Sequence, residues 1–494
     1  MEEARNDEVN LKYPKQVIFV CFYELLERFT FYSIRTILVL YFSDVLNMTE
    51  DEATVYFHSF IIIAYLLPLF GGWIADSFLG KFRTIIYMSC VYATGVVILT
   101  CSSLAPQLSV PGKPFCLIGM VFIAVGTGIL KPCVVPFGAD QFTLPGQNHE
   151  LNEFFSLFYW CINVGSVVAC FASPFIRSNV QCFGNTHCYS LAFTTSTCTI
   201  VLALTIIAIG KKWYIIEEAH HNVVSQFFGC LGYGLWRKFK SHDHRRHWLD
   251  HADDKFSHEL IEDSKIIVRI FTVISPAIVF WALNDKQSSR WTFQARQLNG
   301  QIVDWFRIEP DQMSTSSSLL VLVAVPLFQK IIYPAVGKIG LCKSLLCRMS
   351  IGGFLMCVTF LIAALLQSKL ELNKSESQLS IAWQLPQYVV LVCAEILFVI
   401  SGTNFAYTQS PVNMKSLVTS LWFLTVSFGN IVACIIVGIG IKNMALEFIV
   451  DSCIMAFFMT IFSFLAYRFL RSEMIRFDYS DGITESQRTI TSRT

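Results

Sequence analysis

Long apolar runs recur along almost the whole of this 494-residue sequence, and they restrict what it can fold into. A helix needs about 20 apolar residues to cross the hydrocarbon core of a bilayer. On that measure the sequence predicts twelve membrane-spanning helices, at approximately 17–42, 55–76, 84–103, 115–134, 154–176, 190–210, 266–285, 314–336, 345–366, 384–408, 416–441 and 446–470. We therefore expect an all-α membrane protein.

The composition argues against a soluble protein. Hydrophobic residues make up 54% of the chain and charged residues 15%, whereas soluble domains carry about 25% charged residues. The formal net charge is +1 and the basic residues form no nucleic-acid patch, so we expect a lipid environment and no nucleic-acid partner. No phosphate-binding loop, nucleophile elbow, dinucleotide fingerprint or zinc-site spacing occurs in a suitable context, which argues against an enzyme, a cofactor or a metal.

The basic residues of the loops set the expected orientation. They concentrate on one side of the predicted spans, and the first loop on the other side is acidic. Positively charged loops face the cytoplasm, so we place both termini there, in a multi-pass protein of the plasma membrane. Two glycosylation sequons, at Asn47 and Asn373, then lie outside the cell, where that modification occurs. The loop between Cys182 and Cys188 also faces outward, where a disulfide is permitted, although spacing alone does not set its geometry.

The longest polar stretch, 211–265, lies halfway along the chain and divides the spans six and six. Two six-helix bundles joined by a linker are the layout of major facilitator transporters, which bind substrate between the halves. We therefore predict that fold. Its parts would be a tail at 1–16, a bundle at 17–210, a linker with an amphipathic helix at 211–265, a bundle at 266–470 and a tail at 471–494.

Histidines gather in the linker. A helical spacing would place His244, His247 and His251 on one face, where they could hold a metal. The alternative is a solvated amphipathic helix over the same residues. We favour the second interpretation, because no cysteine or carboxylate stands at a recognisable metal-site spacing.

The first predicted span carries charges where lipid is expected. A charge at the bilayer centre costs about 2.5–3.5 kcal/mol, so such residues are candidates for function. The polar side chains that fall within roughly an 80° arc of that helix, or beside it, are Glu24, Glu27, Arg28, Tyr32 and Arg35. This face indicates a wet cavity, and the alternative is a buried structural ion pair.

Ionisable residues also stand in later spans. Lys131 lies in the fourth span and Glu395 in the tenth. We hypothesise that they pair across the cavity, so that protonation of Glu395 would let a substrate ammonium group replace Lys131. Arg269 and Asp285 lie near the two ends of the seventh span. His58, near the outer end of the second, either titrates at mildly acidic pH or is a satisfied structural group.

A set of longer motifs runs from the first span to the tenth. They are Glu24-Leu-Leu-Glu27-Arg28-Phe29, Gly72-Trp-Ile-Ala-Asp76, Lys131-Pro132, Phe154-Phe155-Ser156, Phe280-Trp281, Ser289-Arg290-Trp291-Thr and Tyr407-Thr-Gln409-Ser-Pro411. The Gly72 motif resembles the loop motif after the second span of major facilitator proteins. The other motifs resemble those of the proton-dependent oligopeptide transporter family, and the resemblance covers nearly the whole chain. It implies a symporter that imports di- and tripeptides by alternating access, with no cofactor and with protons as the coupling ion.

The resemblance also implies a role for each candidate residue. The peptide carboxylate would meet Arg28 and Arg35. Its amino terminus would meet Glu395 and its backbone Asn163. The side chains implied to complete the binding site are Tyr32, Tyr41, Tyr65, Tyr159, Trp281, Gln287, Ser317, Tyr388, Trp422 and Asn430. Those implied to carry proton coupling and gating are Glu24, Glu27, His58, Lys131, Arg269 and Asp285.

The sequence departs from the family pattern at a few positions. Ser317 stands where animal members usually carry Asn, and Asn404 where the family has Glu. Gln329 stands where an Asp commonly partners Arg269. These departures leave two alternatives open: a transporter of other solutes, such as histidine or modified peptides, and a peptide sensor that does not transport.

Overall fold

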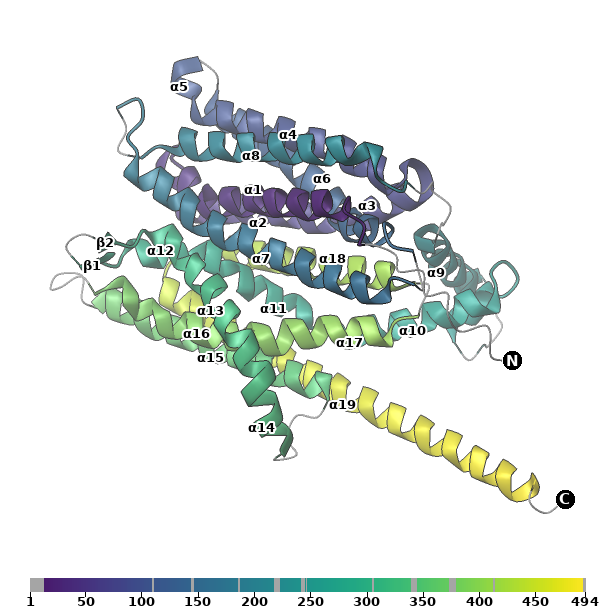
Figure 1. Cartoon of the computed structure of the whole chain (residues 1–494). Coiled ribbons are helices and arrows are strands. Elements are labelled where there is room, and N and C mark those ends of the chain that lie inside the picture. The colour runs from purple at the N-terminus through teal and green to yellow at the C-terminus, as the bar shows by residue number, and fades with distance from the viewer. Residues whose placement is uncertain are drawn as a thin grey trace.

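The computed structural model describes residues 13–108, 111–143, 146–184, 187–216, 223–240, 245, 247–303, 306–338, 344–372, 379–411 and 414–491. Almost all of these residues are helical, and the long helices run side by side (Figure 1). The strands found among them, β1 (Gln301–Val303) and β2 (Phe306–Arg307), form one short antiparallel hairpin.

The helices of the first half are α1 (Val17–Asp44), α2 (Glu50–Leu66), α3 (Pro68–Ile74), α4 (Lys81–Ser103), α5 (Ala105–Leu108), α6 (Gly112–Ala139), α7 (Asn148–Asn179), α8 (Tyr189–Ile209) and α9 (Val223–Lys240). Those of the second half are α10 (His258–Ile274), α11 (Ala277–Asn284), α12 (Arg290–Arg296), α13 (Met313–Leu327), α14 (Tyr333–Lys338), α15 (Leu345–Leu372), α16 (Leu385–Glu395), α17 (Ser401–Gln409), α18 (Lys415–Gly438) and α19 (Met444–Thr491). Short 3-10 turns occupy η2 (Gly210–Lys212), η3 (Trp248–Ala252), η4 (Asp285–Ser288), η5 (Pro310–Gln312) and η7 (Ile381–Gln384). Short π-helical turns occupy η1 (Ala75–Leu79), η6 (Phe328–Ile332) and η8 (Ile396–Ile400).

The helices account for the twelve expected spans. Ten continuous helical stretches in the described part of the chain are long and apolar enough to cross a membrane. The stretches His258–Ile274 and Ala277–Arg296 make an eleventh when taken together, bent by 52°. The bend falls at Pro276, because proline has no N–H to donate and its ring clashes with the preceding turn. The twelfth is α1, which has the length but carries charges that lower its hydropathy.

Two large hydrophobic clusters form the interior. The first cluster is drawn from residues 17–214, together with Phe293 and Val426 from later in the chain. The second cluster is drawn from residues 267–469, together with Phe227. Trp281 packs against both clusters. Helix α2 of the first cluster packs along α18 of the second, so the boundary between the clusters is itself a helix-to-helix contact.

Within the first cluster, α4 and α6 are in backbone contact. A Cβ atom added at Gly95 would lie 2.7 Å from the Ile123 nitrogen, and one added at Gly119 would lie 2.9 Å from the Gly95 oxygen. Only glycine fits such an approach, since any side chain would separate the two helices. These two helices therefore pack as one unit.

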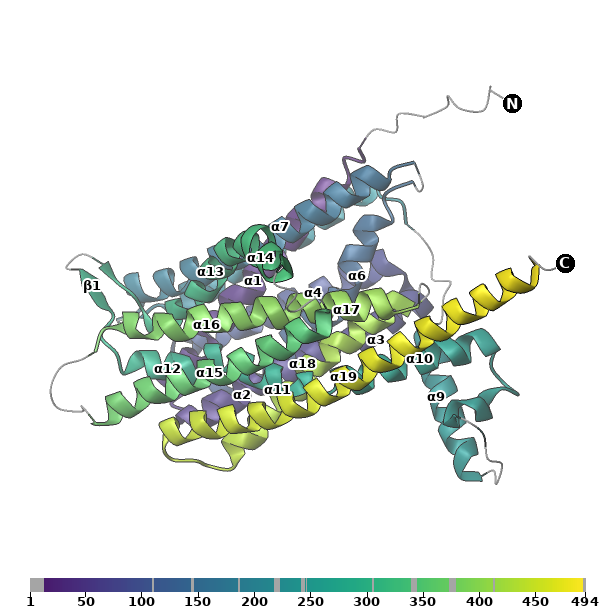
Figure 2. The ribbon, with the colours of Figure 1, turned by 90° about the horizontal axis from the view of Figure 1, so that it is seen from below.

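The molecule has two distinct ends along the helix direction. The end that carries β1, β2, α5 and the turn between α1 and α2 is here called the hairpin end. The opposite end carries α9 and both chain termini, as Figures 1 and 2 show, and is called the linker end. Cys182 and Cys188 form a disulfide between α7 and α8, with their Cα atoms 5.1 Å apart. Asn47 lies exposed between α1 and α2, whereas Asn373 lies outside the described residues.

The prediction for the linker histidines was wrong in its secondary structure. The amphipathic helix is α9, at Val223–Lys240, and His251 lies instead in the short turn η3. His247 begins that turn: its ring accepts a hydrogen bond from the Leu249 N–H, and Asp250 accepts one from the His247 N–H. These reciprocal bonds start a new turn and so prevent a continuous helix. His244 lies outside the described residues, and no group of three possible metal ligands occurs within them.

Candidate functional site

The charged face of α1 forms a compact buried cluster. Arg28 Nε lies 3.1 Å from Glu24 Oε1, and its Nη2 lies 2.5 Å from Glu27 Oε2. Thr127 of α6 donates a hydrogen bond of 2.9 Å to Glu27 Oε1. Both carboxylates are buried, and Tyr32 lies partly buried one turn further along. Two acids therefore share one guanidinium, and the cluster carries an excess of negative charge when both acids are ionised.

Lys131 of α6 lies against aromatic rings rather than a carboxylate. Its Nζ is 3.2 Å from the centre of the Tyr65 ring and 5.0 Å from that of Phe31. The Nζ atom is buried and makes no hydrogen bond among the described residues, although the side chain as a whole is only partly buried. A ring face attracts a desolvated cation by roughly 2 kcal/mol or more. The rings hold the ammonium group in place but do not neutralise it.

The expected pairing of Lys131 with Glu395 is not formed. Glu395, at the end of α16, has Gln287 Nε2 3.5 Å from its Oε1. It pairs with no cation in the part of the chain that the structure describes. The prediction assumed that the nearest opposite charge would satisfy the lysine, and Tyr65 takes that place instead.

A hydrogen-bonded chain crosses from α1 and α2 to α18 and to the turn η4 with the residue that follows it. Arg35 Nη2 donates to Asp285 Oδ1 over 2.6 Å, and Asn430 Nδ2 donates to Asp285 Oδ2 over 2.7 Å. His58 Nδ1 lies 2.6 Å from Asn430 Oδ1, and its Nε2 lies 3.1 Å from Ser289 Oγ. Because Asn430 Oδ1 can only accept, His58 donates from Nδ1, and when the ring is neutral Nε2 accepts from the Ser289 hydroxyl. Both ring nitrogens of His58 are therefore satisfied across the boundary between the clusters.

Aromatic side chains lie at the same boundary. The Trp281 and Trp422 rings meet edge to face at 6.1 Å, and Tyr65 meets Phe423 at 6.0 Å. Trp281 Nε1 and Gln287 Oε1 are buried without a hydrogen-bond partner among the described residues. Buried polar groups in folded proteins normally have partners. These two atoms and Lys131 Nζ therefore each lack the hydrogen-bond partner that a polar ligand could supply.

Other predicted site residues lie elsewhere. Tyr41 is buried in the first cluster and bonds Ser102 Oγ over 2.7 Å, and Tyr388 packs edge-on against Trp291 at 5.1 Å in the second. Both interactions are within one cluster, so neither phenol lines the boundary in this conformation. Ser317 is buried on α13.

The remaining predicted residues are less enclosed. Tyr159 on α7 is exposed, and its backbone oxygen accepts a hydrogen bond from Asn163 Nδ2. Arg269 stacks over Phe469 at 4.6 Å near the linker end. Gln329 lies exposed in η6 and Asn404 exposed on α17.

The hairpin end is closed by ion pairs that the sequence analysis missed. Arg177 of α7 donates two hydrogen bonds to Asp311, Nε to Oδ2 at 2.9 Å and Nη2 to Oδ1 at 3.0 Å. Arg296 pairs with Asp44 over 2.9 Å. A charged residue near the end of an apolar run was the available signal, and it was applied to the seventh span but not to the spans that carry Arg177 and Asp44.

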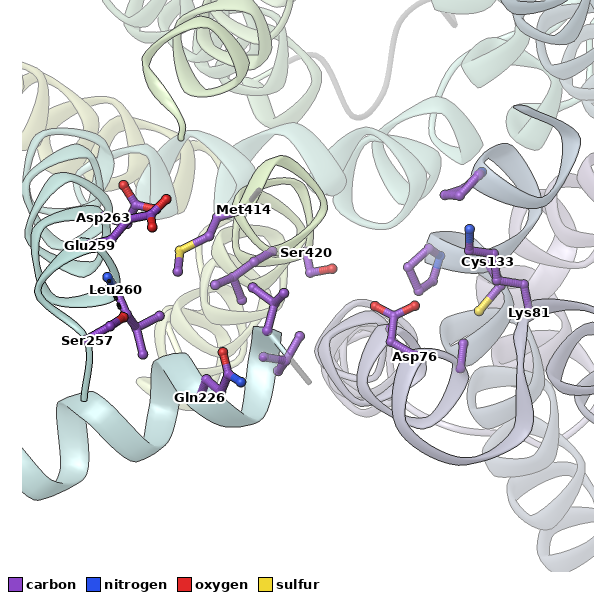
Figure 3. Close-up of a pocket in the computed structure, with 17 residues that line it drawn as sticks. Asp76, Lys81, Cys133, Gln226, Ser257, Glu259, Leu260, Asp263, Met414 and Ser420 are labelled. Carbon is purple, nitrogen blue, oxygen red and sulfur yellow. Dashed lines mark hydrogen bonds between the residues drawn. The ribbon is translucent and has the colours of Figure 1, made fainter. Parts of the chain in front are cut away.

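The linker end is hollow. A cavity of about 540 Å³ opens there between the two sets of helices. Figure 3 shows Asp76 and Lys81 on one side and Glu259 and Asp263 on the other, with Met414 between. The Lys81 ammonium group lies 2.5 Å from Asp140 Oδ2. The hairpin end also holds a cavity, of about 420 Å³, whose lining includes Asp44, Arg177 and Arg296. The two ends therefore differ in the ion pairs that join the halves at the hairpin end, and not in the presence of a cavity.

Comparison with known proteins gives a consistent family. The sequence model described as the POT family matches residues 82–469. Peptide transporter family 1 of Drosophila melanogaster is 39% identical over 363 residues, which are 73% of this chain and 48% of the relative. Solute carrier family 15 member 2 of Homo sapiens is 41% identical over 366 residues, 72% of this chain and 49% of the relative. The chain thus spans about half the length of the curated relatives it matches.

Solved structures share the whole fold. The in meso crystal structure of the POT family transporter PepTSo superposes with a TM-score of 0.82 at 25% identity, covering 93% of this chain and 99% of that one. A crystal structure described as an auto inhibited POT family peptide transporter gives a TM-score of 0.78 at 25% identity, covering 92% and 97%. The twelve-helix major facilitator architecture expected from the sequence is confirmed.

Proposed function

This chain belongs to the POT family, and we propose that it is a proton-coupled symporter that carries di- and tripeptides by alternating access. Relatives named as peptide transporters support the substrate class. The proposal covers the activity of the chain described here, which corresponds to about half the length of the curated relatives.

One observation carries the choice of substrate. Among the described residues, Lys131 Nζ is a buried amino group with no carboxylate partner, and the Glu395 carboxyl group is bonded only by the side-chain amides of Gln287 and Asn284. They come from different halves of the chain, on α6 and α16, so the boundary between the halves would hold one unmatched charge of each sign when both groups are ionised. A short peptide carries a carboxylate and an ammonium group, and would neutralise both together. A guanidinium fork at Arg28 or Arg35 would add a planar contact to the carboxylate.

The acidic pair on α1 supports proton coupling. Glu24 and Glu27 compete for Arg28, at 3.1 Å and 2.5 Å. A proton on either carboxylate would cancel the excess negative charge and free part of the guanidinium for the substrate. Proton binding and peptide binding would then favour each other, which is the reciprocity that coupling requires.

Alternating access follows from the asymmetry of the two ends. The bundles at 17–210 and 266–470 would rock about the site, so that the pairs at the hairpin end break while the cavity at the linker end closes. We place the linker end in the cytoplasm of the plasma membrane. The disulfide and the Asn47 sequon at the hairpin end suit the outer side.

The deciding experiment is uptake of a radiolabelled dipeptide by proteoliposomes. We expect uptake to rise as the outside pH falls from about 7.5 to about 5.5, because proton binding and peptide binding favour each other. Glu27→Gln should weaken that dependence, and the exposed-linker variant Asp253→Asn should not. Flat uptake across this range would contradict proton coupling. If amino acids compete for uptake and dipeptides do not, the substrate is not a peptide. If the protein binds a dipeptide but the liposomes do not accumulate it, the protein does not transport it.

A further inference from the structure

A second buried charge network lies where α11 meets α12, and the proposed function does not use it. Lys286 Nζ is 2.9 Å from Glu447 Oε1 and 2.6 Å from Asp451 Oδ2, both on α19. Arg290 Nε lies 3.1 Å from Glu447 Oε2. The Lys286 and Asp451 side chains are 0% exposed, so this network is closed to solvent at its centre.

The network balances its own charge. It contains two cations and two carboxylates, all from the second half of the chain. Burying ions is costly unless each is paired, so an arrangement with matched charges is far more stable than one with a member missing. Arg290 Nη2 also reaches Asp51 of α2 over 2.5 Å, across the boundary between the clusters. That bond can break without leaving Arg290 unpaired, because Glu447 remains.

Lys286 lies in the middle of the 3-10 turn η4. Successive side chains of a 3-10 helix point about 120° apart, so three neighbours face three directions. Asp285 faces α1, where it meets Arg35. Lys286 faces α19, and Gln287 faces Glu395 on α16. Fixing the middle side chain therefore fixes the direction of both neighbours.

We propose that Lys286, held between Glu447 and Asp451, is a positioning residue that sets Asp285 against Arg35 and Gln287 against Glu395. Helix α19 thereby anchors the turn on which hairpin-end closure depends. The consequence for peptide binding rests on the proposed function, whereas the consequence for closure does not.

The test compares charge removal with charge-balanced removal in the full chain, reconstituted in liposomes. Lys286→Gln leaves Glu447 and Asp451 with too little positive charge. Lys286→Gln together with Asp451→Asn removes one charge of each sign and leaves Arg290 matched with Glu447. Lys330→Gln, at an exposed lysine on η6, is the matched control.

The width of the hairpin end is measured in the absence of substrate. Nitroxides attached through p-acetylphenylalanine at positions 45 and 302, both exposed at the hairpin end in different halves, report its width by pulsed electron paramagnetic resonance. We expect Lys286→Gln to have a lower thermal stability than the wild type and a longer nitroxide distance between positions 45 and 302. The double variant should recover thermal stability but keep a widened distance, and its dipeptide KM should rise by roughly tenfold or more. Lys330→Gln should match the wild type.

Two results would overturn the inference. A double variant with wild-type distances would mean that the network only balances charge, and a single variant with wild-type distances would mean that it positions nothing. If Lys286→Gln yields no folded protein, the double variant alone decides. If the wild type takes up no dipeptide, the proposed function fails while the distance measurement still decides this inference.

Discussion

Arg35 of α1 and Asp285 at the end of α11 form an ion pair of 2.6 Å that joins residues 250 positions apart. The pair connects the first hydrophobic cluster to the second, and both side chains are largely buried. It is therefore a contact that must break if the two halves separate at the hairpin end.

Asp285→Asn should loosen that end. The substitution keeps the shape of the side chain but leaves Arg35 without its carboxylate, and removal of one partner from a buried pair costs about 3–5 kcal/mol. We expect the nitroxide distance between positions 45 and 302 to shift to longer values. Asp253→Asn, in the exposed linker, serves as the control. An unchanged distance would show that the pair does not hold the end closed.

Tyr65→Leu should impair the site through Lys131. The ring face lies 3.2 Å from the ammonium group, and its loss should cost about 2 kcal/mol, or roughly 30-fold in dipeptide affinity, because Lys131 is no longer held as a cation. Tyr65→Phe keeps the ring and should stay close to the wild type. Competition binding in detergent measures both. Equal losses in the two variants would instead assign the effect to the Tyr65 hydroxyl.

Arg177→Lys should destabilise the protein although it keeps the charge. Arg177 binds Asp311 through two parallel hydrogen bonds, a geometry that an ammonium group cannot reproduce. We expect a lower thermal midpoint in detergent. The paired variant Arg177→Met with Asp311→Leu should be less harmful than Arg177→Met alone, because it leaves no buried charge without a partner. A midpoint for Arg177→Lys equal to that of the wild type would contradict the bidentate role.

The linker turn η3 should loosen in acid. Burial, and next the ammonium group of Lys265, hold the pKa of His247 below its ordinary value of 6.5. The folded turn needs the neutral ring, which accepts from the Leu249 N–H. This contribution to stability is present above pH 6.5 and is lost as the pH falls through the lowered pKa.

Hydrogen exchange of peptides that cover the turn, corrected for intrinsic rates, measures this effect. Exchange at Leu249 should rise in acid in the wild type. His247→Asn keeps a capping acceptor that does not titrate, so its exchange should be independent of pH. Equal acid sensitivity in both proteins would place the titrating group elsewhere.

The sequence alone predicted those features that depend on a single segment of the chain. Apolar length alone predicts the spans, and helical spacing alone places Glu24, Arg28 and Arg35 on one face of α1. The 52° bend at Pro276 and the π turn after Glu395 were not anticipated, since both depend on how neighbouring helices accommodate the backbone.

Side-chain contacts between residues far apart in the sequence could not be predicted in this way. Lys131 was assigned to the wrong partner, because no local rule favours a Tyr65 ring over a Glu395 carboxylate. Lys286 was passed over although Asp285 and Gln287 beside it were both chosen. Its partners lie 161 and 165 residues away, and the 3-10 turn aims it away from its neighbours.

The backbone contact between α4 and α6 has a mechanical consequence. Helices separated by long side chains can slide as those side chains change rotamer, but Gly95 and Gly119 leave no such slack. Helices α4 and α6 should therefore move together as one rigid unit within the first cluster. A rearrangement within the first half must therefore take place at other helix contacts, and the contact between α2 and α18 is where it would reach the second half.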